Sequence, residues 1–153
     1  WAAQSELAGG GAERLQSTIP SAVLWRFNNA ATEAVLSALR LARGRTGGPL
    51  VLKCEGHYHG WADEGLVGFA PPPEKWGDHE APTQLHPSQG VIPEVLEKFV
   101  VARWNDPDHL RRRVAEFSGQ IAAIIFEPVL CNTGCMEPVP GMIAPIRELC
   151  DHE

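Results

Sequence analysis

The chain has 153 residues, the length of a single domain, and its 44% hydrophobic content is enough for a buried core. Its formal net charge of −6 argues against a nucleic-acid partner, which usually requires a basic surface. No apolar run reaches the ~18 residues of a membrane-spanning helix, and no signal peptide is visible, so we expect no membrane segment.

Strands and helices alternate along the predicted chain. In chain order we expect a strand at 21–27, a helix at 31–43, strands at 50–54, 66–69 and 99–102, a helix to about Phe117, a strand at 121–126 and a helix from about Met142. This alternation predicts an α/β fold with a mostly parallel sheet and helices on both faces. The run at 121–126 is continuous and β-branched, which favours a central buried strand.

Three segments lie outside these elements. Residues 1–20 are weakly patterned, and Gly9-Gly10-Gly11 should interrupt any helix there. Residues 70–93 are rich in Pro, Gly and His and predict a long loop, which in a compact domain is usually functional or disordered. A second loop rich in Gly and Pro is expected at 128–141.

The four cysteines show no disulfide framework, which favours a reducing compartment and a cytoplasmic protein. The chain begins at Trp1 rather than Met and stops at Glu153 within a predicted helix. We therefore expect it to be part of a longer protein.

The first candidate site is the turn that leads into the helix at 31–43. Ala30, Ala31 and Thr32 lie there, and backbone N–H groups at a helix N-terminus attract anions such as phosphate. The alternative is an ordinary helix, capped by Asn28-Asn29 and ended by Gly44.

The second candidate site is the loop Gly56–Gly60, which follows the strand at 50–54. Ligands of open α/β sheets bind beyond the carboxyl ends of the strands, and Tyr58 is suited to stack on a planar ligand there. A tight turn with a half-buried tyrosine is the alternative. A zinc site is a further alternative, although its residues lack the usual compact knuckle; they are His57, His59, Cys131 and Cys135.

The third candidate site follows the strand at 121–126. Glu127 and then Asn132 place a carboxylate and an amide at the carboxyl end of that strand, where they can touch a ligand. Asp63 and Asp106 are expected to be turn and cap residues instead.

Together these motifs resemble class III aminotransferases of fold type I, which depend on pyridoxal phosphate, and in particular the glutamate-1-semialdehyde aminomutase-like branch. The resemblance covers about residues 20–153. It is carried by Arg26-Phe27 through Thr46-Gly47, Glu55-Gly56-His57-Tyr58-His59-Gly60-Trp61-Ala62-Asp63, Trp104-Asn105-Asp106, and Ile121 through Glu137.

The resemblance implies a role for each matching position. The family's phosphate cradle, Ser-Gly-Thr, falls on Ala30, Ala31 and Thr32. The aromatic that stacks on the pyridine ring falls on Tyr58, with His59 beside it. The family's Glu and Asn near the phenolic oxygen of the ring fall on Glu127 and Asn132.

The chain departs from the family pattern in two ways. Ala30-Ala31 replaces Ser-Gly, which removes a hydroxyl donor and adds a Cβ where Gly allows close approach. The family's Schiff-base lysine and the Asp that pairs with the pyridine nitrogen lie downstream, beyond Glu153. Lys53, Lys75 and Lys98 do not match that lysine, so residues 1–153 are expected to be part of a cofactor-binding large domain without its catalytic base.

The implied reaction of the longer protein is transfer of an amino group between an amino acid or amine and a carbonyl compound, or within one molecule as in an aminomutase. The resemblance also implies a homodimer. We expect no metal. One alternative is a phosphate- or nucleotide-binding α/β module without covalent chemistry, although neither Gly-x-Gly-x-x-Gly nor a Walker motif is present. Another alternative is an inert fragment or a decayed paralogue, which Ala30-Ala31 favours.

Overall fold

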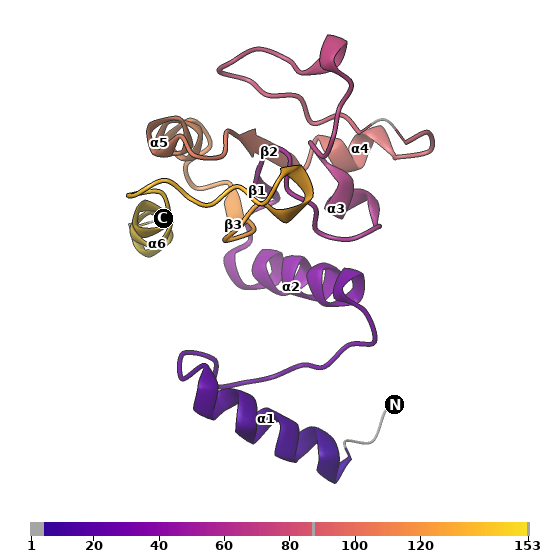
Figure 1. The fold of residues 1–153 in the computed structure, drawn as a ribbon, viewed down its shortest axis with the longest axis vertical. Helices are drawn as coiled ribbons and strands as arrows, with labels where there is room; N and C mark the ends of the chain where they lie inside the picture. Colours follow the sequence, from indigo (N-terminus) through magenta and orange to yellow (C-terminus); the bar gives the residue numbers. More distant parts are fainter. Residues whose placement is uncertain (1–4, 87, 153) are drawn as a thin grey trace.

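The computed structural model describes residues 5–86 and 88–152 (Figure 1). Residues 1–4 of the predicted weakly patterned start, residue 87 of the predicted loop and residue 153 lie outside the described residues. A parallel sheet has the order β2-β1-β3. Its strands are β1 (Leu50–Cys54), β2 (Phe99–Ala102) and β3 (Ile121–Ile125). The predicted α/β class and parallel sheet are confirmed.

Helices cover both faces of this sheet, as predicted (Figure 1). One face packs against α2 and the other packs against α5 and α6. The α-helices are α1 (Glu6–Thr18), α2 (Ala31–Thr46), α3 (Asp63–Leu66), α4 (Pro93–Leu96), α5 (Pro107–Glu116) and α6 (Ile143–His152), and the 3₁₀ helices are η1 (Pro73–Lys75) and η2 (Cys131–Thr133). Asp106 caps α5 by accepting a hydrogen bond from the His109 N–H, as expected.

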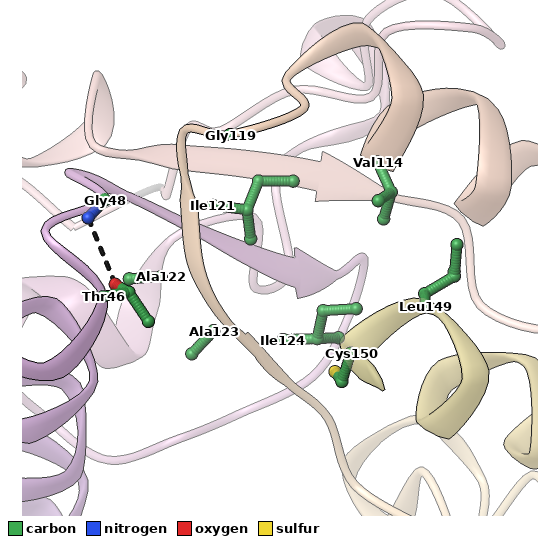
Figure 2. A pocket seen from close by; sticks show the side chains of 10 residues that line it. All are labelled: Thr46, Gly48, Val114, Gly119, Ile121, Ala122, Ala123, Ile124, Leu149 and Cys150. Atoms are coloured by element: carbon green, nitrogen blue, oxygen red, sulfur yellow. Dashed lines mark hydrogen bonds between the residues drawn. The ribbon is translucent and has the colours of Figure 1, made fainter. Parts of the chain in front are cut away.

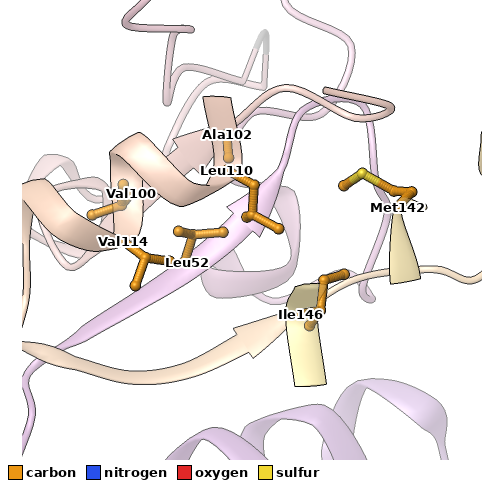
Figure 3. Close-up of a cluster of buried hydrophobic side chains, with 7 residues drawn as sticks. All are labelled: Leu52, Val100, Ala102, Leu110, Val114, Met142 and Ile146. Carbon is orange, nitrogen blue, oxygen red and sulfur yellow. The ribbon is translucent and has the colours of Figure 1, made fainter. Parts of the chain in front are cut away.

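The core forms two clusters because successive residues of a strand point to opposite faces. On β1, Leu52 points toward α5 and α6, and Val51 points toward α2. Burial of one such side chain stabilises the fold by about 1.5–3 kcal/mol. The first cluster, shown in Figure 3, consists of Leu52, Val100, Ala102, Leu110, Val114, Met142 and Ile146.

The prediction that 121–126 is a central buried strand is wrong. β1 is the central strand, β3 lies at one edge of the described sheet, and every residue of β3 is only partly buried. A continuous apolar run reports that both faces of a strand are covered, but it carries no information on the order of strands.

Two predictions for the N-terminal segment are also wrong. α1 forms through Gly9-Gly10-Gly11, with Ser5 as its N-cap accepting a hydrogen bond from the Ala8 N–H. Each glycine costs a helix only about 1 kcal/mol relative to alanine, so the cap and the good helix formers around the glycines prevail. Residues 21–27 are not a strand; they run as an irregular segment between α1 and α2.

The limits of α2 and the segment at 66–69 differ from the predictions as well. The N-cap of α2 is Ala30 rather than Asn28-Asn29, and the helix passes through Gly44 to end at Gly47. Gly47 has φ = +76°, the left-handed conformation that ends helices. The predicted strand at 66–69 is instead the end of α3 and a following turn, because a short apolar run does not distinguish strand from helix.

The predicted loop at 70–93 is confirmed for its described residues, apart from the single turn of η1 and the start of α4 at Pro93. An antiparallel bridge between Gly77 and Pro82 ties the loop together. Among the helices that the structure describes, none is long and apolar enough to cross a membrane.

Candidate functional site

The carboxyl ends of β1 and β3 carry a reciprocal pair of hydrogen bonds. The Tyr58 N–H donates to Glu127 Oε1 at 2.6 Å, and the Glu127 N–H donates to His57 Nδ1 at 2.7 Å. The two strands are neighbours in the sheet, so the loops that follow them emerge side by side. Two candidate segments that are 69 residues apart in sequence thus meet directly.

Glu127 also joins a third segment to this pair. Its Oε2 accepts a hydrogen bond of 3.3 Å from the Cys131 N–H, at the start of η2. Both carboxylate oxygens of Glu127 therefore bind backbone N–H groups, one from each of two loops. Glu127 acts within the chain as a link between the Tyr58 loop and the segment that carries Asn132.

The N-terminus of α2 lies against the other end of the Tyr58 loop. The Trp61 N–H donates to Thr32 Oγ1 at 3.1 Å. Gly60 has φ = +103°, and a Cβ on it would lie 2.6 Å from Thr32 Oγ1, so only glycine allows this close approach. The structure thus brings Thr32 and Tyr58 to one edge of the sheet, as the sequence predicts.

The first turn of α2 keeps backbone donors available for an anion. Ala30 makes no side-chain capping bond, and the first helical hydrogen bond runs from the Ala34 N–H to the Ala30 oxygen. The N–H groups of Ala31, Thr32 and Glu33 have no partner within the helix by its geometry. Ala31 is the first helical residue, so the dihedral freedom of a glycine is not needed there.

Tyr58 is half-buried, and its ring packs at 5.1 Å from the ring of Phe69. Phe69 in turn stacks on His86, with 5.9 Å between ring centroids. Phe69 and His86 were not among the predicted site residues. The aromatic spacing in the sequence does not reveal this contact, because the loop at 70–86 folds back to make it.

His57 and His59 are held as neutral imidazoles. Burial, together with the nearby charge of Lys53, lowers the pKa of His57 to about 4 and that of His59 to about 3. Because His57 Nδ1 accepts the Glu127 N–H, the proton of His57 resides on Nε2. The Nε2 atoms of both histidines are buried and have no hydrogen-bond partner among the described residues.

The sequence prediction missed Lys53 as a site residue. Its side chain is 0% exposed, and its Nζ donates a hydrogen bond of 2.6 Å to the Gly65 carbonyl oxygen. Burial lowers the pKa of Lys53 and the charge of Glu127 partly offsets this effect, which leaves the pKa at about 7. The signal in the sequence was a single lysine inside the apolar run of β1.

Asn132 lies in η2 on the protein surface, one residue beyond the Cys131 N–H that binds Glu127. The described structure does not support the zinc alternative. Within residues 5–86 and 88–152, no group of three or more His, Cys, Asp and Glu side chains is placed to hold a metal ion.

A separate hollow, which Tyr58 does not line, lies along β3 (Figure 2). Side chains of β3, α5 and α6 line it, among them Ile121, Val114 and Leu149. A hydrogen bond of 3.1 Å from the Gly48 N–H to Thr46 Oγ1 closes one end. This lining is mainly apolar, so it offers little to a charged or phosphorylated ligand.

Comparison with known proteins identifies a family that matches this chain. A family model described as aminotransferase class-III matches residues 2–153. A glutamate-1-semialdehyde 2,1-aminomutase of Pelodictyon phaeoclathratiforme is 42% identical over 142 residues, which are 93% of this chain and 31% of the relative. A protein of the same name from Salinibacter ruber is 38% identical over 133 residues, 87% of this chain and 29% of that relative.

Solved structures show the same arrangement of the chain. An omega-transaminase from Sphaerobacter thermophilus matches with a TM-score of 0.87 and 29% identity over 99% of this chain and 34% of its own. A glutamate-1-semialdehyde-aminomutase from Pseudomonas aeruginosa PAO1 matches with a TM-score of 0.77 and 27% identity, over 98% of this chain and 31% of its own. The chain thus spans about a third of the length of these relatives.

Proposed function

Because this chain belongs to the class-III aminotransferase family, we propose that the protein containing it transfers amino groups with pyridoxal phosphate as cofactor. The observation that carries this proposal is the meeting of Thr32, Tyr58 and Glu127 at one edge of the sheet. Names of relatives support it: the chain is similar to aminomutases and to transaminases, and one aminomutase structure contains PMP.

The proposed site fits a planar, phosphorylated group. The free N–H groups of Ala31 and Thr32 and the Thr32 hydroxyl would hold the phosphate, and the exposed Ala30 and Ala31 leave room for it. The half-buried Tyr58 ring would stack on the pyridine ring. When bound, pyridoxal phosphate supplies the electron sink for the chemistry.

The remaining predicted residues would complete this side of the cofactor site. His59 lies beside Tyr58 with a buried Nε2 that has no partner in the described part of the chain. Glu127 would fix the Tyr58 loop through its backbone, and Asn132 would lie near the phenolic oxygen of the ring. We propose that the Schiff-base lysine and the Asp that pairs with the pyridine nitrogen are not among residues 1–153, which makes this part inactive by itself.

The proposed substrates are a small amino acid or amine and a carbonyl compound. The aminomutase reaction of the glutamate-1-semialdehyde type is the favoured form, because relatives of that name are 38–42% identical to most of this chain. We further propose a homodimer in the cytoplasm. All four cysteines are free in the described structure, which supports a reducing compartment.

Substitution of Tyr58 in the full-length protein tests this function. Tyr58→Ala should weaken pyridoxal phosphate binding by up to about tenfold, because ring stacking contributes about 0.5–1.5 kcal/mol. Tyr58→Phe, which keeps the ring, is the matched control and should bind as the wild type does. Spectrophotometric titration of the cofactor gives the affinities. A wild-type protein that neither binds pyridoxal phosphate nor transfers an amino group would refute the proposal.

A further inference from the structure

Lys53 occupies the centre of the sheet, in a position where a charged side chain is uncommon. It lies on β1 between Val101 of β2 and Ile125 of β3, and it shares the α2 face with Val51. Its side chain is 0% exposed. Lysine is almost never fully buried without a partner, so the partner of this amine identifies its role. Lys53 would stay buried in a longer protein as well, because additional residues can cover surface but do not expose this side chain.

That partner is the backbone that follows Tyr58. Nζ of Lys53 donates to the Gly65 oxygen at 2.6 Å, and the same oxygen accepts a second hydrogen bond of 3.3 Å from the His59 N–H. A Cβ on Gly65 would clash with the Gly60 oxygen, so the backbones of these two residues approach closely. The Gly65 oxygen thus links the Lys53 side chain to the backbone of His59.

The other hydrogen bonds that hold this loop do not involve the Gly65 oxygen. Glu127 holds the backbone at Tyr58, and Thr32 holds it at Trp61. Between these two residues, the His59 N–H is fixed through the Gly65 oxygen alone among the hydrogen bonds described above. The Lys53 amine holds that oxygen through a buried hydrogen bond.

We propose that Lys53 is a positioning residue for the cofactor, which holds the Gly65 carbonyl and thereby fixes the loop that presents Tyr58 and His59. The inference rests on the proposed function, because it assigns Lys53 to the support of the Tyr58 wall. Lys53 does not touch the cofactor in this role. It acts through the backbone of residues 59–65.

The ionisable groups around Lys53 determine how pH affects this contact. Lys53 interacts electrostatically with Glu127, Cys54, His57, His59 and His86. Burial lowers the pKa of Lys53 from 10.5 to about 7. Between these two values the unfolded chain holds one more proton than the folded chain, so stability rises with pH through this window. Below about pH 7 both states hold the proton, and this dependence disappears.

The test compares three variants of the full-length protein: Lys53→Met, Lys53→Gln and, as control, Lys75→Met at an exposed lysine. Lys53→Met removes the donor and the charge but keeps the length. Replacing a buried charge with an apolar chain is often neutral or stabilising, so its apo form should melt no lower than the wild type at pH 7. Its affinity for pyridoxal phosphate should still fall, by no more than the roughly tenfold loss expected for Tyr58→Ala, because the Tyr58 ring is displaced rather than removed.

Two further readouts separate positioning from packing. The visible circular dichroism of the bound cofactor, recorded at saturation, should change in Lys53→Met because the Tyr58 ring is displaced. Lys53→Gln keeps a donor without the charge and should recover part of the affinity. Wild-type stability relative to Lys53→Met should rise between about pH 7 and 10.5.

Each other outcome overturns a defined claim. If Lys53→Met binds pyridoxal phosphate with wild-type affinity and dichroism, Lys53 does not position the site, while the proposed function stands. If neither Lys53 variant folds, Lys53 is a structural residue of the core and the inference is wrong. If the wild-type protein does not bind pyridoxal phosphate, the proposed function and this inference both fail.

Discussion

Glu127 shows how one carboxylate organises loops where a parallel sheet ends. Beyond the last residue of a strand, backbone N–H groups lose their partners in the neighbouring strand, and buried groups of this kind require replacements. The two oxygens of Glu127 replace them for Tyr58 and Cys131, and its own N–H is accepted by His57. The side chain therefore couples three loop positions.

Removal of this carboxylate should destabilise the protein measurably. Glu127→Ala leaves the part-buried Tyr58 N–H without its acceptor, and an unsatisfied buried donor costs about 1–3 kcal/mol. The Cys131 N–H, which is exposed, can bind water instead and should contribute less. Glu127→Gln retains one oxygen acceptor and should lose less. Urea denaturation gives the free energy of unfolding, with Glu137→Ala at an exposed position as control. Equal stability of Glu127→Ala and the control would show that the two bonds contribute nothing.

α2 shows how the ends of an element determine what it can bind. Its N-terminus has no side-chain cap, which leaves backbone donors beside Thr32. Its C-terminus is closed by Gly47, whose N–H donates to the Arg43 oxygen at 2.9 Å. An anion at the first turn would complement the dipole of the helix by about 0.3–1 kcal/mol. The unequal capping of the two ends matches an anion site at the N-terminus.

The same substitution should have opposite effects at the two glycines of this helix. A Cβ at Gly44 or at Gly47 would meet nothing within 4 Å, so packing does not distinguish them. Gly44→Ala lies inside the helix and should stabilise it by up to about 1 kcal/mol. Gly47→Ala must adopt φ = +76° and should destabilise the protein by about 1 kcal/mol or more. Thermal unfolding gives the change in melting temperature of each variant. Changes of the same sign would contradict the placement of Gly44 inside the helix and of Gly47 at its left-handed C-cap.

Across the whole molecule, the described residues leave apolar surface uncovered. α1 has no buried residue and lies apart from the sheet, on the far side of α2 (Figure 1). Leu7 and Leu24 are 88% and 91% exposed, and the edge of β3 is only partly covered. Single exposed side chains of this kind are ordinary on a protein surface, so they identify no contact with another protein by themselves.

The 153-residue chain by itself should not capture pyridoxal phosphate covalently. Lys53 is buried and donates a hydrogen bond to the Gly65 oxygen, and Lys75 and Lys98 are exposed. Borohydride reduction with the cofactor, followed by peptide mapping, should therefore yield no stoichiometric adduct. A single, complete adduct on any of the three lysines would show that this part of the protein holds its own reactive amine.

Sequence reasoning located the elements that have strong periodicity. The strands at 50–54 and 99–102 and the helix after Asp106 agree with the structure, because apolar spacing and helix caps are local signals. It failed for α1, where a local cap and good helix formers outweigh three glycines, and for 66–69, where a short apolar run does not distinguish a strand from a helix. For the site, Thr32, Tyr58 and Glu127 do meet, whereas Phe69 and Lys53 were missed.

The sequence by itself determined the α/β class, the residues at the strand ends and the family resemblance, since these depend on local pattern and on ordered motifs. Only the tertiary structure decided that β1 is central, that Glu127 binds two backbone N–H groups and that the Lys53 amine donates to the Gly65 carbonyl oxygen. Those facts depend on which segments become neighbours in space. The order of strands and the buried hydrogen bonds depend on contacts between residues that are far apart in the chain. The spacing of these residues along the sequence does not predict those contacts.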